Sequence, residues 1–551
     1  MDDANLLGGD AADAAEGAAG EARRPGSAST RALARAGLIV TVLFLASRVL
    51  GYVRTIAMAA AVPDIAQLDP FNLAFRIPDF LFQLVAAGAL SSSLIPIIAA
   101  LLAKDEEARA WRVVSTVSTL MLSALALLAG LVLFFAPQLV PLITPGFDAD
   151  EMARTTEMTR IMVLSPMFLA AGSVATSVLN SRGRFAAAAL APLVYNAAII
   201  FGALVLVPLA GLNGLAWGVV LGAAGHVLVQ VPSVIRLGAR IVPHVDLRDP
   251  QARLAFLLLV PRAIGLGATQ VVFLVMASLA TTVGEGAATI FVFAFTLLQI
   301  PIGVIGVPLG VVLLPSLARE AALGATGAFV RLVSRGLSLL AFVMLSISAL
   351  GIVVAEDVVR FLFGVAHVKE DAIEATAALL AVFLIGLTAH SLIAVLARSF
   401  YALQDTKTPV AAALVAVVSN IAIANVLIGP LGLNGLGFAI AVSAWLETVV
   451  LIVLLGRRMP GMYGGMRHVG VVGVKSLVSA LAGGLAAFGV SSLLLGAWGE
   501  DPGYLLLFVR GVLAVGAGGL VIVAGSLALR ITELRTIVGV VVDLLRRRGR
   551  A

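Results

Sequence analysis

Residues 183–215 read GRFAAAALAPLVYNAAIIFGALVLVPLAGLNGL, and residues 407–436 read KTPVAAALVAVVSNIAIANVLIGPLGLNGL. The two stretches align after one gap of about three residues, so that Asn196 falls on Asn420, Pro208 on Pro430, and one Leu-Asn-Gly-Leu turn on the other. Chance similarity between alanine-rich segments is the alternative, but the matched asparagine and turn lie outside the alanine runs. The chain therefore contains an internal repeat with a period close to 222 residues.

The composition assigns the chain to the membrane class. Of its 551 residues, 60% are hydrophobic and only 12% are charged, and the mean hydropathy is +1.07. A soluble domain carries about 25% charged residues. The 55 glycines suit close packing of transmembrane helices. Because the sequence has no cysteine, a disulfide framework, a thiolate metal site and a cysteine nucleophile are all excluded.

Apolar segments long enough to cross a hydrocarbon core of about 30 Å recur along the chain. They cover residues 38–62, 71–102, 113–136, 158–181, 185–208, 213–235, 254–282, 287–317, 330–354, 373–402, 409–428, 434–456, 469–495 and 504–529. Each repeat holds six of them, and an even number of crossings gives both copies the same orientation. We therefore expect an all-α polytopic membrane protein of about 14 transmembrane helices, with two six-helix lobes in parallel repeat, a central cavity and two C-terminal helices.

This organisation divides the chain into five parts. Residues 1–37 are small and polar and are expected to form a disordered cytoplasmic tail. Helices 1–6 make an N-lobe over residues 38–237, and helices 7–12 make a C-lobe over residues 250–456. Helices 13 and 14 occupy residues 467–530, and residues 531–551 form a basic cytoplasmic tail.

Lysine and arginine gather on alternate loops, as they do on the short cytoplasmic loops of membrane proteins. With the N-terminus inside, the inner loops hold Lys104, Arg109, Arg112, Arg182, Arg184, Arg236, Arg240, Arg319, Arg398, Lys407, Arg457 and Arg458. The opposite loops hold few cations, such as Arg154 and Lys369, among acidic residues. This pattern predicts that both termini are cytoplasmic. It also explains the pI near 10.0 without nucleic acid, so no nucleic-acid partner is expected.

The first two helices contain several ionisable residues. Arg48 and Arg54 lie well inside helix one, Asp69 precedes helix two, and Arg76 opens it. An ionisable side chain in a bilayer needs a partner or a water-filled cavity. One interpretation is a cationic cavity for an anion such as pyrophosphate, which the arginine fork fits well. The other is that Arg48 or Arg54 pairs with Asp69 as a structural tie, or extends toward the membrane surface.

Prolines and glycines interrupt helices two and eight at corresponding places in the two repeats. Candidate hinge and gating positions are Gly51 between the two arginines of helix one, Pro78 and Gly88 in helix two, and Pro301, Gly306 and Pro308 in helix eight. Broken helices at equivalent positions are typical of substrate sites and of the hinges of alternating access. Ordinary kinks tolerated by neighbouring helices are the alternative.

Other polar positions carry weaker signals. Glu447 and Gln299 either line the cavity or satisfy a neighbouring helix, and Arg510 is expected to extend toward the membrane surface from a helix end. The five histidines are scattered without ligand spacing, so no metal site is expected. No phosphate-binding loop occurs, and no cofactor or enzymatic chemistry is predicted.

Several motifs together resemble the MviN/MurJ family of murein-precursor lipid flippases, in the multidrug/oligosaccharidyl-lipid/polysaccharide exporter superfamily. They are Ser-Arg-Val-Leu-Gly at 47–51 followed by Arg54, AFRIPDFLFQLVAAGALSSSLIPI at 74–97, Leu179-Asn180 followed by Arg184-Phe185, GVPLGVVLLPSLARE at 306–320, and SFYALQDTKTPV at 399–410. The resemblance implies a multi-pass protein of the bacterial inner membrane. It also implies a groove at helices 13 and 14 for the lipid tail, and translocation of the undecaprenyl-pyrophosphate-linked disaccharide pentapeptide, lipid II.

The resemblance further implies that Arg48, Arg54, Asp69 and Arg76 bind substrate in the central cavity. The partners that it implies are the lipid-linked murein precursor and membrane lipids, with proteins of peptidoglycan synthesis and division as candidates. The chain departs from the family at Phe82, Ala87 and Thr296, where relatives carry charged residues. Some relatives bind sodium with acidic residues in helices seven and eleven. The corresponding segments of this chain contain no aspartate or glutamate, so coupling to membrane potential is the default hypothesis.

Three other functions remain open at this point. An exporter of another lipid-linked oligosaccharide would use a similar cationic cavity. A drug exporter would place carboxylates in helix one, where this chain has arginines. A non-transporting scaffold for wall-synthesis enzymes would tolerate changes at the buried arginines.

Overall fold

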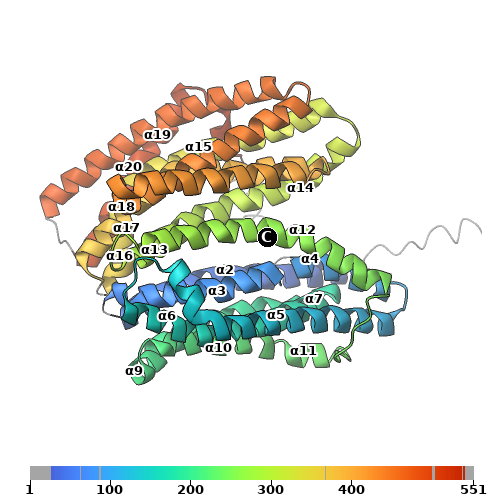
Figure 1. Cartoon of the computed structure of the whole chain (residues 1–551). Helices are drawn as coiled ribbons and strands as arrows, with labels where there is room; N and C mark the ends of the chain where they lie inside the picture. Colours follow the sequence, from blue (N-terminus) through green and yellow to red (C-terminus); the bar gives the residue numbers. More distant parts are fainter. Residues whose placement is uncertain are drawn as a thin grey trace, which may run out of the picture.

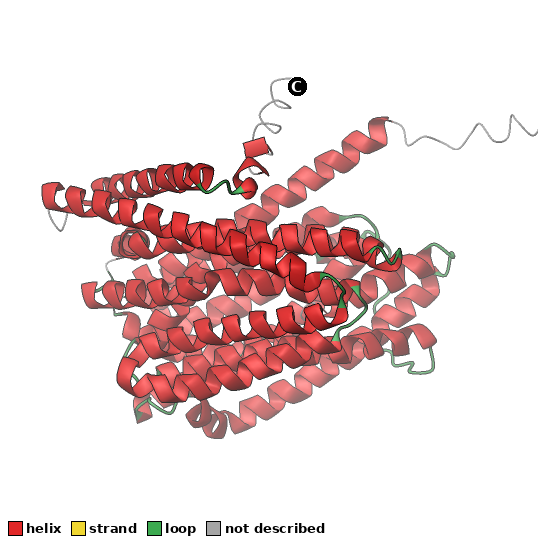
Figure 2. Ribbon diagram, turned by 90° about the horizontal axis from the view of Figure 1, so that it is seen from above, coloured by secondary structure: helices red, strands yellow, loops and turns green. Residues whose placement is uncertain are grey.

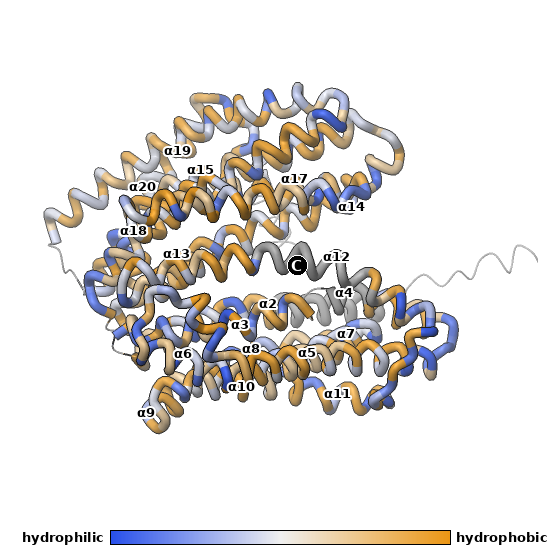
Figure 3. Tube along the Cα trace, in the orientation of Figure 1, coloured by the Kyte–Doolittle hydropathy of each residue, from blue (hydrophilic) through white to orange (hydrophobic). Residues whose placement is uncertain are grey.

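The structure is a computed structural model that describes residues 27–539, apart from residues 63, 86–88, 367, 499–502 and 537. Every regular element in this part of the chain is helical (Figure 2). The helices lie side by side, with hydrophobic residues along their lengths and hydrophilic residues gathered toward the loops (Figure 3). This is the arrangement expected of a bundle in which lipid surrounds the middle and water the ends.

The first half of the chain forms one group of helices (Figure 1). Its elements are α2 (Ser27–Ala61), η1 (Ile65–Leu68), α3 (Asp69–Val85), α4 (Ala89–Leu102), α5 (Glu107–Ile143), α6 (Ala149–Met162), α7 (Ser165–Ser181), α8 (Phe185–Phe201), η2 (Gly202–Leu206), α9 (Val207–Ala210), α10 (Asn213–Leu228) and α11 (Val231–Ile235). Helix α2 begins at Ser27, earlier than the expected limit of the tail. The expected crossing at 158–181 is divided between α6 and α7.

The second half forms the other group, followed by two further helices. Its elements are α12 (Pro250–Ala280), α13 (Ala287–Pro301), η3 (Ile302–Gly306), α14 (Val307–Ala322), α15 (Thr326–Val353), α16 (Ala355–Phe363), η4 (Gly364–Ala366), α17 (Glu370–Ala402), α18 (Lys407–Arg458), α19 (Met462–Trp498) and α20 (Gly503–Ala528). We call α2–α11 the first lobe and α12–α18 the second lobe. Helices α12 and α13 lie between the two groups (Figure 1), and α12 packs against α3, α4 and α5 of the first lobe.

Eleven helical stretches of the described chain are long and apolar enough to cross a membrane. One of them, α18, runs for 52 residues and contains two predicted segments joined at Gly432, where φ is 54°. The predicted segments 71–102 and 254–282 coincide with α3 and α4 and with α12. Each of the fourteen predicted segments therefore has a helical counterpart, and the prediction of an all-α polytopic membrane protein is confirmed.

The turns of the internal repeat share one backbone geometry. Gly211 and Gly432 occupy matching places before the Leu-Asn-Gly-Leu turns, and both have positive φ, 61° and 54°. The glycines inside those turns lie against the preceding helix. A methyl group at Gly214 would lie 2.4 Å from the carbonyl carbon of Leu206, and one at Gly435 would lie 2.3 Å from the carbonyl oxygen of Leu427. Each matched turn therefore requires glycine, because the two helices cross there too closely for a side chain.

Helices α19 and α20 pack on each other and on the second lobe, mainly through α15 and α16. A buried ion pair joins α20 to α16, in which Arg510 Nε donates to Asp357 Oδ1 at 3.1 Å. The prediction that Arg510 extends toward the membrane surface was wrong, because its partner is an acidic residue about 150 positions earlier in the sequence. Pairing removes the cost of leaving either charge alone in the apolar interior.

Ion pairs between loops follow the predicted alternation of sides. Arg109 Nε donates to Asp249 Oδ2 at 2.8 Å, joining two loops that were assigned to one side of the membrane. On the opposite side, Lys369 Nζ donates to Asp64 Oδ2 at 2.7 Å. The hydrogen bond from Lys369 holds the pKa of Asp64 below its usual value. The Asp64–Lys369 pair also links a first-lobe loop to a second-lobe loop, so the two lobes are held together on this side.

Candidate substrate-binding cavity

A cavity of about 1030 Å³ lies between the two lobes. Side chains from α2, α3, α7 and α8 of the first lobe line one part of it, and side chains from α12, α13, α17 and α18 of the second lobe line the rest. Of the four predicted substrate-binding residues, Arg48, Arg54 and Arg76 line the cavity and Asp69 does not. The structure therefore brings three arginines from two helices to one space.

Arg54 reaches across the first lobe to α8. Its Nη1 donates to Asn196 Oδ1 at 3.1 Å, while its Nε is buried and has no hydrogen-bond partner in the described part of the chain. Asn196 is the residue that the internal repeat singled out, yet nothing in the sequence indicates that it contacts an arginine. The guanidinium is thus positioned on one side and retains free N–H groups for a ligand.

Arg48 lies six residues earlier on α2 and also faces the cavity. Its guanidinium carbon lies 5.4 Å from the Phe44 ring centre. A methyl group at Gly303 would lie 3.0 Å from Arg48 Nη1, so the glycine of the π-helical segment η3 leaves room for this side chain. Arg48 therefore extends from the first lobe to the second without an ion-pair partner among the residues described.

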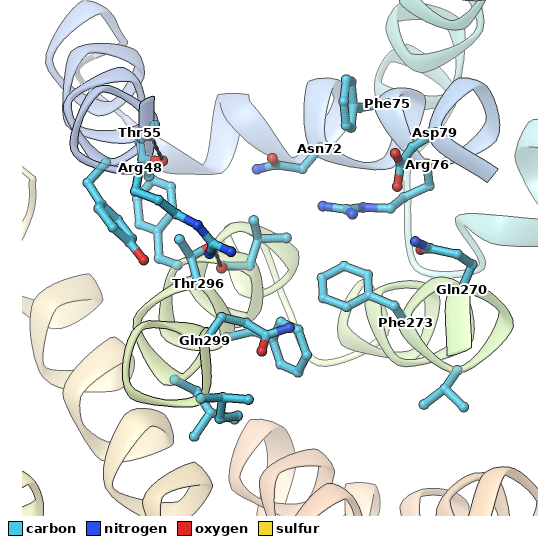
Figure 4. Close-up of a pocket in the computed structure, with 18 of the residues that line it drawn as sticks. Arg48, Thr55, Asn72, Phe75, Arg76, Asp79, Gln270, Phe273, Thr296 and Gln299 are labelled. Carbon is cyan, nitrogen blue, oxygen red and sulfur yellow. Dashed lines mark hydrogen bonds between the residues drawn. The ribbon is translucent and has the colours of Figure 1, made fainter. Parts of the chain in front are cut away.

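Arg76 also contacts the second lobe. Its guanidinium carbon lies 4.2 Å above the ring of Phe273 on α12, a cation–π contact (Figure 4). In Figure 4, Arg48 and Arg76 extend toward the same space from two helices, and Asp79 lies beside Arg76. The Nε of Arg76 is buried and, within the described chain, has no hydrogen-bond partner. Stacking fixes the plane of the guanidinium and leaves its edge free for an anion.

Asp69 lies outside the cavity lining, at the start of α3. Its Oδ1 accepts hydrogen bonds from the backbone N–H of Thr289 at 2.7 Å and from its hydroxyl at 2.6 Å. The amide of Asn72 also donates to the Thr289 hydroxyl, at 2.9 Å. These contacts join the start of α3 in the first lobe to the start of α13 in the second. Neither interpretation of Asp69, as a cavity residue or as the partner of an arginine, matches this contact.

The predicted hinge positions have different surroundings. Gly51 lies within the uninterrupted helix α2, and Pro78 lies inside α3. Pro301 precedes the π-helical segment η3, Gly306 ends it and Pro308 follows it, and this segment interrupts the predicted eighth crossing. Gly88 lies outside the described residues.

The cavity contains polar residues that the sequence left undecided or did not indicate. Gln299 and Glu447 both line it. Asp79 and His390 also line it and were missed, although Asp79 lies within the quoted 74–97 motif. Of the positions that depart from the family pattern, Thr296 lines this cavity and Phe82 lines a smaller one of about 250 Å³, while Ala87 lies outside the described residues.

These features define a class of protein. Two helical lobes surround a cavity within a bundle of helices that are long and apolar enough to cross a membrane, and arginines with free N–H groups line part of it. This is the architecture of a membrane transporter.

Sequence comparison gives the family. The sequence model of the protein family described as Lipid II flippase MurJ matches residues 58–508 of this chain. A lipid II flippase MurJ of Burkholderia cenocepacia is 32% identical over 444 residues, which are 78% of this chain and 85% of that protein. A probable lipid II flippase MurJ of Rhizobium tropici is 32% identical over 429 residues, or 75% of this chain and 79% of its own length. The chain belongs to the lipid II flippase MurJ family, whose members are transporters and not enzymes.

Comparison of structures confirms the fold. A lipid II flippase MurJ in an inward closed conformation superposes with a TM-score of 0.71 at 18% sequence identity, covering 90% of this chain and 99% of that one. An inward-facing multidrug-resistance MATE transporter of the MOP superfamily gives a TM-score of 0.61 at 15% identity, covering 78% and 98%. Both likenesses concern the fold alone.

Proposed function

We propose that this chain moves lipid II, the undecaprenyl-pyrophosphate-linked peptidoglycan precursor, from the inner to the outer leaflet by alternating access. In this proposal the pyrophosphate binds Arg48, Arg54 and Arg76. The observation that carries it is the unpaired state of these side chains, since in the described structure none of the three has an ion-pair partner within 4 Å. Asp69 is already hydrogen-bonded to Thr289. Asp79 lies beside Arg76 in the cavity lining, but the two make no ion pair within 4 Å.

The shape of the cavity supports entry from one side. Its lining includes Asn180, Phe185 and Ala413, which lie near helix ends assigned to the cytoplasm. At the opposite end the lobes are joined by the Asp69–Thr289 hydrogen bonds and by the Asp64–Lys369 ion pair. With both termini in the cytoplasm, as proposed from the loop charges, this is an inward-facing state. Rocking of the lobes about their contacts would then open the other side.

The lipid part of the substrate requires an apolar path beside the cavity. Helix α19 exposes Leu485, Phe488 and Leu493, at 73%, 62% and 75% of their surfaces. These exposed side chains support the proposal that α19 and α20, within residues 467–530, offer a groove to the lipid tail while the headgroup crosses between the lobes. Neighbouring peptidoglycan synthesis and division proteins would receive the flipped lipid.

A complementation experiment tests this function. The resident flippase of a host bacterium is depleted, and this chain or its Arg54→Ala variant is expressed while lipid II exposed on the outer leaflet is measured. We expect the wild-type chain to restore exposure and Arg54→Ala to lose about tenfold or more of it, because a hydrogen-bonded charge contact is removed. Arg154→Ala, which removes an exposed arginine of α6 distant from the cavity lining, is the control and should restore exposure fully.

The outcomes separate the alternatives. A wild-type chain that is present in the membrane but restores nothing would favour another lipid-linked oligosaccharide, as the departures at Phe82 and Thr296 suggest. An Arg54→Ala variant as active as the wild type would favour a scaffold or a different binding mode.

A further inference from the structure

The second-lobe wall of the cavity carries a carboxylate without a partner. Glu447 on α18 lines the cavity and is partly exposed to it. No hydrogen bond or ion pair to its side chain is found in the part of the chain that the structure describes. Because an ionised carboxylate is costly within the membrane unless a cation balances it, the ionised form of Glu447 requires a positive charge from elsewhere.

Packing contacts place other unsatisfied polar groups beside Glu447. The Thr448 hydroxyl donates to the carbonyl of Ala389 at 3.2 Å, so Glu447 and His390 lie at the same depth on α18 and α17. The close contact of Gly435 with Leu427 fixes the two arms of α18 antiparallel, which brings Ser443 level with Asn420. Ser443 and Asn420 are 2% and 5% exposed, and both line the cavity.

These neighbours have unused hydrogen-bonding capacity. Ser443 Oγ, Asn420 Oδ1 and His390 Nε2 are all buried and, among the described residues, all lack a hydrogen-bond partner. Ser443 and Glu447 are four residues apart on one helix, so their side chains lie on one face. Buried polar atoms rarely remain unsatisfied in a resting protein, and a group of them around a cavity indicates a ligand that donates hydrogen bonds.

Among the described side chains, the second-lobe lining of the cavity holds no lysine or arginine, and the internal repeat allows the two walls to be compared. In the first lobe, Asn196 accepts a hydrogen bond from Arg54. Asn420 is the repeat counterpart of Asn196, and the same offset of 224 residues places Ser278 at the position that corresponds to Arg54. The second lobe has therefore kept the asparagine but has no arginine at the partner position.

We propose that the second-lobe wall binds a primary ammonium group on the peptide part of the lipid-linked headgroup, with Glu447 as its counter-ion and Ser443 and Asn420 as hydrogen-bond partners. An ammonium group has three donors, which suits a carboxylate flanked by neutral acceptors. Within the described residues no group of three His, Cys, Asp or Glu side chains could hold a metal ion. This inference rests on the proposed function.

The two walls would then recognise opposite charges of one molecule. Arg48, Arg54 and Arg76 face the cavity from the first lobe and bind the anionic pyrophosphate, while Glu447 binds the ammonium from the second lobe. A headgroup with both charges thereby contacts both lobes. A headgroup that lacks the amine contacts only one lobe through a charge.

The test uses the full-length chain in proteoliposomes with two lipids. One is the undecaprenyl-pyrophosphate-linked disaccharide peptide with a free side-chain amine, and the other is the same lipid with that amine acetylated. Translocation is measured for the wild type, for Glu447→Gln, which keeps the shape and removes the charge, and for the control Glu374→Gln, an exposed carboxylate of α17 outside the cavity lining.

We expect the wild type and Glu374→Gln to prefer the free amine by about tenfold, and Glu447→Gln to transport both lipids at the lower rate. Equal transport of both lipids by the wild type would overturn the inference while leaving the proposed function intact. A Glu447→Gln variant that still prefers the free amine would also overturn the inference and leave the proposed function intact. So would a Glu447→Gln variant that transports neither lipid, because that result would indicate a coupling proton or an inorganic cation at Glu447. Failure of the wild type to move either lipid would instead overturn the proposed function.

Discussion

At the scale of single residues, the proposed role of Arg54 in anion binding depends on a neutral neighbour. Asn196 Oδ1 holds the guanidinium at 3.1 Å without cancelling its charge. An aspartate at this position would make an ion pair with Arg54 and reduce its attraction for an anion. We therefore predict that Asn196→Asp lowers lipid II exposure in the complementation assay about tenfold, and that Asn196→Ala lowers it less, because the charge remains but its position is lost.

The matched control is Asn425→Asp, which introduces the same charge at an exposed position of α18 where the amide donates only to the carbonyl of Ile421. At equal abundance in the membrane, Asn425→Asp should give the same amount of lipid II exposed on the outer leaflet as the wild type. A wild-type signal from Asn196→Asp would show that the free charge of Arg54 is not required for transport.

At the scale of helices, the repeat turn is a site of close crossing. A methyl group at Gly435 would lie 2.3 Å from the carbonyl oxygen of Leu427, and backbone on the preceding arm of α18 cannot move aside easily. We predict that Gly435→Ala destabilises the protein by about 1–3 kcal/mol, the usual cost of forcing atoms into a packed interior. This destabilisation should appear as a lower Tm when thermal unfolding in detergent is monitored through the loss of soluble monomer.

Gly429 provides the comparison on the same helix. A methyl group there meets nothing within 4 Å, and its φ is not positive. Gly429→Ala should therefore leave Tm unchanged or raise it slightly, since alanine favours the helix. Similar Tm values for the two variants would mean that the helix arms of α18 separate at little cost.

At the scale of the whole molecule, the contacts of Thr289 join the two lobes on the side opposite the proposed cavity entrance. Asp69 supplies a buried carboxylate to them, so its removal should favour states in which the lobes separate there. The absence of cysteine from the sequence allows a single reporter, Thr296→Cys, in the cavity wall. We predict that Asp69→Ala increases labelling of this cysteine by an impermeant maleimide added outside cells at least several-fold.

Asp64→Ala tests whether burial sets the size of this effect. Its ion pair with Lys369 also joins the lobes, but both side chains are substantially exposed to solvent, and such pairs contribute only about 0–1 kcal/mol. Labelling of the reporter should change little in this variant. If the maleimide labels Thr296→Cys no faster in the Asp69→Ala protein than in the protein with Asp69, then Asp69 does not help to hold the lobes together on this side.

The sequence by itself determined the membrane class, the fourteen segments, the repeat and the arginines of the first two helices. Each of these depends on local quantities: the length of an apolar run, the type of residue within it and the similarity of one stretch to another. A charged residue in the middle of an apolar segment is recognisable without its neighbours because the bilayer makes it costly wherever it points. Arg48, Arg54 and Arg76 were predicted on this basis, and all three line the cavity.

Only the tertiary structure decided which polar groups meet. Asp69 hydrogen-bonds to Thr289, 220 positions away, Arg510 pairs with Asp357, and Glu447 has no partner among the described residues. The direction in which a side chain points depends on helix rotation and on the packing of distant helices, which a single sequence does not specify. Apolar length therefore fixed which segments cross the membrane, while contacts between helices fixed which charges are paired and which remain free for a substrate.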